Sequence, residues 1–93
     1  MTDRKYLCDR FDSALYAVTA EIKRILLSLP DGIKATAEEI RLRAGKPLIL
    51  TVGGAPMWVG EGGTADYLPP ARPIYISPEQ INNIYLNLCN HSV

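Results

Sequence analysis

Apolar residues in the first third of the chain recur at intervals of three and four positions, from about residue 9 to residue 28. This spacing places them on one face of a helix. The residues of that face are Phe11, Leu15, Val18, Ile22, Ile25, Leu26 and Leu29. Pro30 disfavours helical backbone in the residue before it, and Pro30-Asp31-Gly32 has the composition of a turn. The pattern predicts one long helix that ends before Pro30.

The next segment alternates polar and apolar residues from Glu39 to Arg43. Thr36-Ala-Glu-Glu39 resembles a helix capping box, so helix and strand compete here, and we favour a strand. Side chains alternate between the two faces of a strand. Ile40 and Leu42 are therefore expected to face the core, with Glu39, Arg41 and Arg43 together on the opposite face.

A second strand is expected from Leu48 to Val52, after a turn at Gly45-Lys46-Pro47. Its residues are nearly all apolar and favour β structure, which is typical of a strand covered on both faces. The two glycines at 53–54 end it, and Met57-Trp58-Val59 is expected to return as a hairpin partner. Trp58 then points away from the face shared by Met57 and Val59.

The stretch from residue 60 to 73 is rich in Gly and Pro, which predicts an exposed loop without regular structure. Ile74-Tyr75-Ile76 is expected to form a last short strand. Ser77-Pro78-Glu79-Gln80 has the residues of a helix start, with Ser77 as N-cap and the glutamine closing a capping box. The helix is expected to run to about Asn90, with one face formed by Ile81, Ile84, Tyr85 and Leu88.

These elements predict a single α+β domain over residues 1–93. We expect a small, mainly antiparallel sheet of about four short strands, flanked by the long N-terminal helix and the C-terminal helix. A chain of 93 residues can bury a modest core without disulfides or metals.

Composition excludes several classes of function. Ten basic and ten acidic residues give no net charge, so no nucleic-acid partner is expected. Cys8 and Cys89 form no metal-ligand or disulfide pattern, which predicts free thiols, no metal and a cytoplasmic location. No run approaches the roughly 18 apolar residues of a membrane span.

Candidate chemistry is confined to a few side chains. A phosphate-binding loop needs G-x-x-x-x-G-K-[ST], and neither Gly45-Lys46-Pro47 nor the glycines at 60–63 fit it, so no cofactor site or catalytic residue is expected within the chain. Arg41 and Arg43, on one strand face, are the leading candidates, because two guanidinium groups can grip a phosphate or carboxylates on a neighbouring subunit. The alternative is a surface or interdomain ion pair, for example with Glu39.

Three aromatic residues are candidates for an interaction surface: Trp58, Tyr67 and Tyr75. The Pro-rich loop at 60–73 could become ordered on a partner. For Trp58, the competing interpretation is a role in the core or as cover for a sheet edge.

Three segments together carry a family resemblance: Glu39-Ile-Arg-Leu-Arg43, then Gly45-Lys-Pro47 with the apolar run to Gly54, then Ile76-Ser-Pro-Glu-Gln-Ile81. In this order they resemble the N-terminal domain of stage III sporulation protein AA, a secretion-type ATPase family. The resemblance covers residues 38–93. It implies a non-catalytic assembly domain and a fragment that ends before the P-loop motor domain.

The resemblance implies further partners. They are the missing motor domain, which would bind ATP and Mg²⁺, neighbouring protomers of a homo-hexamer, and membrane proteins of the channel between mother cell and forespore. It implies that Arg41 and Arg43 approach nucleotide held by the motor domain, and a place in the mother-cell cytoplasm, peripheral to the membrane. The alternative function is a small KH-like nucleic-acid-binding module, because a short sheet backed by helices with local Arg and Lys can bind a strand.

Overall fold

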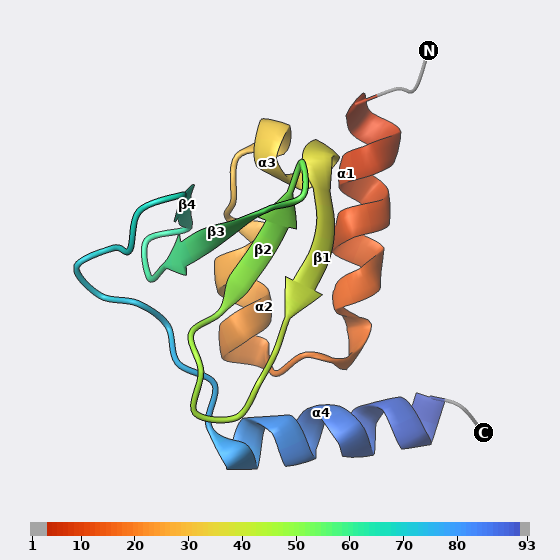
Figure 1. Ribbon diagram of the computed structural model, residues 1–93. Helices are drawn as coiled ribbons and strands as arrows, with labels where there is room; N and C mark the ends of the chain where they lie inside the picture. Colours follow the sequence, from red (N-terminus) through yellow and green to blue (C-terminus); the bar gives the residue numbers. More distant parts are fainter. Residues whose placement is uncertain (1–3, 92–93) are drawn as a thin grey trace.

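An antiparallel sheet with strand order β1-β2-β3-β4 organises the protein, as Figure 1 shows. The computed structural model describes residues 4–91. The strands are β1 (Ala37–Arg41), β2 (Ile49–Val52), β3 (Ala55–Gly60) and β4 (Thr64–Asp66). Helices precede and follow the sheet in the chain, so the predicted α+β class, with N-terminal and C-terminal helices and a four-stranded antiparallel sheet, is confirmed.

The prediction of one continuous N-terminal helix is wrong. The chain forms α1 (Arg4–Ser13), a 3-10 turn η1 (Ala14–Ala17) and α2 (Ala20–Leu27). Val18 and Thr19 are extended, with ψ of 157° in both residues. Two consecutive β-branched residues favour this backbone, and the break lets both helices pack on the sheet. The predicted apolar face is still buried, apart from half-buried Val18.

A short helix, α3 (Asp31–Thr36), stands where the turn at residues 30–32 was predicted. Pro30 precedes its first turn with φ of −58°, and Asp31 places a carboxylate at its N-terminus. The hydroxyl of Thr36 donates to the carbonyl of Gly32 at 2.7 Å. A proline before a first turn suits a helix start as well as a turn. Residues 30–32 therefore fit both elements, and the prediction of a turn missed the helix.

β1 begins and ends two residues earlier than predicted, and its pairing with β2 shifts between Ala37 and Glu39. Such a bulge adds one residue to one strand and twists it. Beyond the bulge the predicted alternation holds, since Ile40 and Leu42 pack against the core while Arg41 and Arg43 are exposed.

The hairpin between β2 and β3 turns at Gly53 and Gly54, whose φ values are 60° and 78°. Glycine adopts positive φ without strain, and two such residues make the turn whose twist matches a hairpin. Leu48 and Leu50 are fully buried, whereas Ile49 and Thr51 are half-buried, so β2 is covered more completely on one face than on the other.

The segment at 60–73 contains β4, which corrects the prediction of an exposed loop without regular structure. Gly60 and Gly63 are buried, and Gly60 bridges to Pro73 at the other end of the segment. The predicted strand at 74–76 forms isolated bridges to Ala44 and Pro47 instead. Backbone hydrogen bonds connect residues 74–76 to the loop between β1 and β2. One of them runs from Leu48 N–H to the Ile74 carbonyl, at 2.7 Å.

The last helix, α4 (Pro78–His91), begins with the predicted capping box. Gln80 N–H donates to the Ser77 hydroxyl at 3.1 Å, and Ser77 N–H donates to the Gln80 side chain at 2.8 Å. Ile84 is buried against the core. Ile81, of the same predicted face, is half-buried against the core, whereas Tyr85 and Leu88 are exposed. The helix lies across one end of the molecule (Figure 1), and Asn87 Nδ2 donates to the Ala17 carbonyl at 2.9 Å.

The core lies between one face of the sheet and the first two helices. It is formed by Phe11, Leu15, Ile22 and Leu26 on the helical side and by Leu48, Leu50 and Val59 on the sheet side, with Ile76 and Ile84. Within residues 4–91, no helix is both long enough and apolar enough to cross a bilayer.

Candidate functional site

The outer face of the sheet, on the side away from α1 and α2, carries one row of cross-strand neighbours. Arg41 pairs with Ile49, Ile49 with Trp58, and Trp58 with Asp66. We call these four residues the outer row. Residues directly opposite in antiparallel strands have side chains about 5 Å apart on the same face. The row therefore sets a cation, two apolar side chains and an anion next to one another.

A second set of neighbours lies beside the outer row. Glu39 pairs with Thr51, and Thr51 pairs with Pro56. Arg41 Nε lies 3.5 Å from Glu39 Oε1, with side-chain exposures of 43% and 58%. An ion pair this exposed is worth at most about 1 kcal/mol. The Arg41 guanidinium can therefore leave Glu39 for a stronger anionic partner at little cost.

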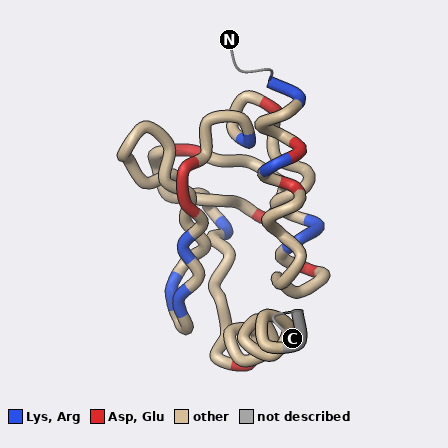
Figure 2. The backbone as a smooth tube through the Cα atoms, turned by 90° about the vertical axis from the view of Figure 1, so that its right-hand side faces the viewer, with Lys and Arg blue, Asp and Glu red and all other residues tan. Residues whose placement is uncertain are grey.

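The end of β1 and the loop that follows it concentrate positive charge. Arg41, Arg43 and Lys46 are all exposed, and Figure 2 shows blue segments gathered at this end of the strand, next to the red segment of the two glutamates. The loop has a defined backbone: Lys46 N–H donates to the Arg43 carbonyl at 3.0 Å, and Gly45 N–H donates to the Ile76 carbonyl at 2.6 Å. Gly45 has φ of 74°, which favours glycine at this turn.

The structure brings two of the predicted candidates together. Arg41 and Trp58 were proposed for separate reasons and occupy the same row, on either side of Ile49. Trp58 is half-buried and faces away from buried Met57 and Val59, as its parity predicted. Arg43 lies past the end of β1, so the strand face predicted to hold both arginines holds Arg41 alone.

The remaining aromatic candidates are exposed. Tyr67 directly follows β4 and is 56% exposed, which places it one residue from Asp66 in the outer row. Tyr75 is 60% exposed and lies in the segment that clasps the β1–β2 loop. Tyr67 is therefore next in sequence to the outer row, whereas Tyr75 lies beside the loop that follows β1.

Sequence reasoning missed Ile49 and Asp66. Ile49 could have been found, because a two-residue turn at 53–54 fixes the register and sets Ile49 opposite Trp58. Asp66 could not, because it lies on the strand that was taken for a loop.

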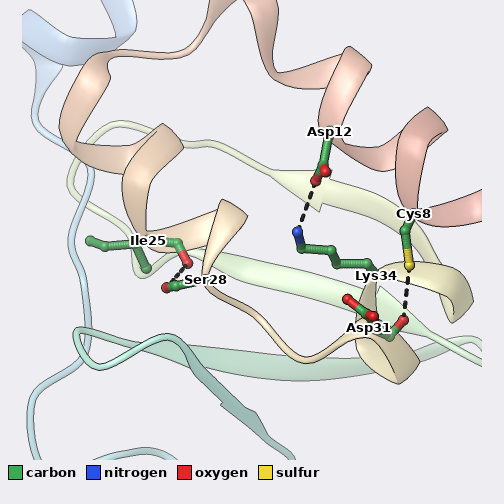
Figure 3. Close-up of polar contacts among 6 residues, drawn as sticks. All are labelled: Cys8, Asp12, Ile25, Ser28, Asp31 and Lys34. Atoms are coloured by element: carbon green, nitrogen blue, oxygen red, sulfur yellow. Dashed lines mark hydrogen bonds and ion pairs between the residues drawn. The ribbon is translucent and has the colours of Figure 1, made fainter. Parts of the chain in front are cut away.

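Polar contacts on the helical side hold elements together (Figure 3). Lys34 of α3 is buried and its Nζ lies 2.9 Å from Asp12 Oδ1 of α1, which ties the two helices. The Cys8 thiol donates to the Asp31 carbonyl at 3.4 Å. Desolvation, followed by the nearby Asp31 carboxylate, raises the pKa of the Cys8 thiol. A raised pKa disfavours the thiolate, the nucleophilic form of cysteine.

The outer row can bind a partner by combining an aromatic surface with a guanidinium group. Arg and Trp are enriched at the energetic centres of protein interfaces, and Arg grips carboxylates or phosphates with two parallel hydrogen bonds. Among residues 4–91, no group of three or more His, Cys, Asp or Glu side chains could hold a metal ion.

Comparisons with protein-family models, with curated proteins and with solved structures found no match.

Proposed function

We propose that the protein is a non-catalytic N-terminal assembly domain of a sporulation ATPase of the stage III AA type. In this proposal it supports formation of a ring and couples the motor domain to the channel between mother cell and forespore. It works in the mother-cell cytoplasm, peripheral to the membrane.

The segments that carry the family resemblance have clear structural roles in this fold, which supports the proposal. Glu39-Ile40-Arg41 is the regular part of β1, and Gly45-Lys46-Pro47 turns the chain with Gly45 at positive φ. The apolar run forms the central strand β2 and ends at the hairpin glycines. Ser77 and Gln80 cap α4. The motif residues thus form strands, turns and a helix cap of this fold.

The outer row is the single observation on which the proposal depends most. It offers Arg41 and Trp58 on a sheet face that the first two helices leave open. A neighbouring protomer or the chain's own motor domain can cover such a face, with Trp58 packed against apolar surface and Arg41 on a carboxylate. Arg41 and Arg43 can also reach a phosphate of nucleotide that the motor domain holds.

The proposed partners follow from this role. In this proposal ATP and Mg²⁺ are bound by a motor domain with a P-loop. Six protomers form the ring, and channel membrane proteins contact it. The chain described here contributes contacts and no reaction step.

The test uses the complete ATPase with Arg41→Ala, Arg43→Ala and the double substitution. We expect the double variant to lower hexamer formation and the ATPase rate about tenfold, as for a central interface arginine. Sedimentation velocity measures the hexamer, and phosphate release measures the rate. Arg24→Ala is the matched control, because Arg24 is an exposed arginine on α2. Unchanged assembly and rate in the double variant would remove both arginines from the mechanism.

A KH-like nucleic-acid-binding module is the second candidate, and the cluster of Arg41, at the end of β1, with Arg43 and Lys46 in the loop after it favours it. The neighbouring Glu38 and Glu39 and the zero net charge oppose it. Titration of the protein with fluorescent single-stranded RNA at rising salt separates the two functions. Tight, salt-sensitive binding would replace the assembly function with RNA binding.

A further inference from the structure

The first strand of the sheet has one unpaired edge. β1 pairs with β2 on one side, and within residues 4–91 no strand pairs with its other side. The backbone N–H and C=O groups along such an edge can hydrogen-bond to another extended chain. The bulge between Ala37 and Glu39 interrupts the regular edge, which leaves Glu39, Ile40 and Arg41 as its regular part.

A groove runs along this edge, between β1 and α1. It has a volume of about 300 Å³. Its apolar lining comes from Leu7, Phe11 and Ala14 on the helical side and from Ala35, Ala37 and Ile40 on the other. Helix α1 lies beside β1 in Figure 1, past the free edge, and Figure 2 views the molecule from that side. An added strand would therefore have an apolar helix face beneath it.

We propose that an extended peptide segment of another protein binds in this groove as a fifth strand, antiparallel to β1. Peptide recognition by strand addition obtains affinity from main-chain hydrogen bonds and specificity from pockets for alternate side chains. Here the residue opposite Ile40 points into the groove, so it is apolar. Antiparallel pairing is the more stable arrangement per residue and continues the pattern of the sheet.

The charges on β1 define the flanking residues of the peptide. Glu39 and Arg41 lie on the outer face, one on each side of Ile40. Opposite charges directly across a strand pair stabilise it, and like charges destabilise it. From its N-terminus, the complementary antiparallel peptide therefore has an acidic residue, an apolar residue and a basic residue. Its acidic residue faces Arg41 and its basic residue faces Glu39.

A second copy of the chain is a weaker occupant, although its own Glu39-Ile40-Arg41 has the same alternation. Symmetric pairing of two β1 strands would bring the α1 helix of the second copy into the space beside the edge. The first copy's α1 already lines that space. A peptide without a helix beneath it has no such conflict.

The test is an NMR titration of the 93-residue chain with three synthetic peptides. The probe is acetyl-Thr-Glu-Val-Lys-Thr-amide. The reversed peptide, acetyl-Thr-Lys-Val-Glu-Thr-amide, has the same composition, and a third peptide carries N-methyl groups on valine and lysine to block main-chain hydrogen bonds. We expect the probe to shift the amide signals of β1 and α1 and to bind at least about tenfold more tightly than either control.

Variants of the protein locate the site. Ala14→Trp places a large side chain over the groove from an exposed position, and should weaken binding of the probe about tenfold. Ala20→Trp is the matched control at an exposed alanine of α2, and should bind the probe as the original chain does. Exchange of the charges, Glu39→Arg with Arg41→Glu, should reverse the preference between the probe and the reversed peptide.

Several results would overturn the proposal: no binding of the probe at millimolar concentration, equal binding of the N-methylated peptide, or a preference for the reversed peptide by the original chain. Dimerisation of the chain alone that the probe does not dissociate would assign the edge to a second copy. The proposal is independent of the sporulation function, because these titrations contain neither a motor domain nor nucleotide.

Discussion

At Gly63 the turn between β3 and β4 touches the end of α2. Gly63 is buried with φ of 77°, and its N–H donates to the Gly60 carbonyl at 3.1 Å. A Cβ atom added there would collide with the Ser28 hydroxyl and would lie 3.2 Å from the Ser28 carbonyl oxygen. That hydroxyl is held by a 2.7 Å hydrogen bond to the Ile25 carbonyl (Figure 3). The contact needs a residue without a side chain.

Gly63→Ala should lower the free energy of unfolding by about 2 kcal/mol, because it adds both positive-φ strain and a collision. Urea denaturation followed by circular dichroism measures the change. Gly62→Ala is the control, since a Cβ at Gly62 meets nothing within 4 Å, and it should change stability by less than about 0.5 kcal/mol. Equal effects of the two substitutions would contradict the close contact.

Among the secondary-structure elements, α4 has the most complete start signal. Ser77 and Gln80 satisfy one another's backbone N–H groups. Ser13 also precedes a helical segment, η1, yet its side chain makes no capping hydrogen bond. The two serines therefore offer a matched comparison of a serine that caps with one that does not.

Ser77→Ala should destabilise the protein by about 1 kcal/mol, the typical loss for an N-cap serine. Ser13→Ala should have little effect. Thermal unfolding of both variants measures the difference. A loss of stability in Ser13→Ala as large as in Ser77→Ala would show that the hydroxyls act through something other than capping.

The elements that the sequence predicted well are those set by local rules. The capping box, the turn at Gly53-Gly54 and the alternation around Ile40 need only neighbouring residues. The break at Val18-Thr19 was missed because no proline or glycine marks it, and the packing of two helices on one sheet decides it. β4 was missed because its three residues gain a strand conformation only by pairing with β3.

For the molecule as a whole, α4 has fewer anchors than the sheet. Ile84 is its buried side chain, and Ile81 packs half-buried against the core. Asn87 hydrogen-bonds to η1, and Tyr85, Leu86 and Leu88 are exposed. β2 lies between two strands and carries fully buried Leu50. Regions with few buried contacts open at lower free energy than the core. We expect α4 to detach before the sheet unfolds.

Native-state hydrogen exchange should show α4 amides exchanging faster than those of β2 and β3. Ile84→Ala should speed exchange in α4 at least about tenfold, because it removes the buried anchor, and leave the sheet nearly unchanged. Asn83→Ala, at an exposed position of the same helix, should change neither. Equal acceleration of the sheet by Ile84→Ala would mean that α4 and the sheet unfold as one unit.

The candidate site could be predicted only in part. Arg41 and Trp58 were identified singly, from strand parity and residue type. To place both residues in one row, the register of three strands must be known. The two hairpin glycines fix the register of β2 with β3, whereas a bulge alters the register of β1 with β2. The groove beside β1 could not be predicted. It depends on the position of α1, and that position depends on the break at Val18-Thr19, which was not predicted.

The bridge between Gly60 and Pro73 closes the segment that contains β4 at its base. Both ends of this segment are anchored. Gly60 is the last residue of β3, and Ile74, directly after Pro73, accepts a hydrogen bond from Leu48 N–H. Lengthening the exposed part around Tyr67 and Leu68 would therefore leave the anchors in place, and each doubling of a flexible loop costs only about 0.6 kcal/mol. The tip is thus a natural position for an epitope tag or a fluorescent label.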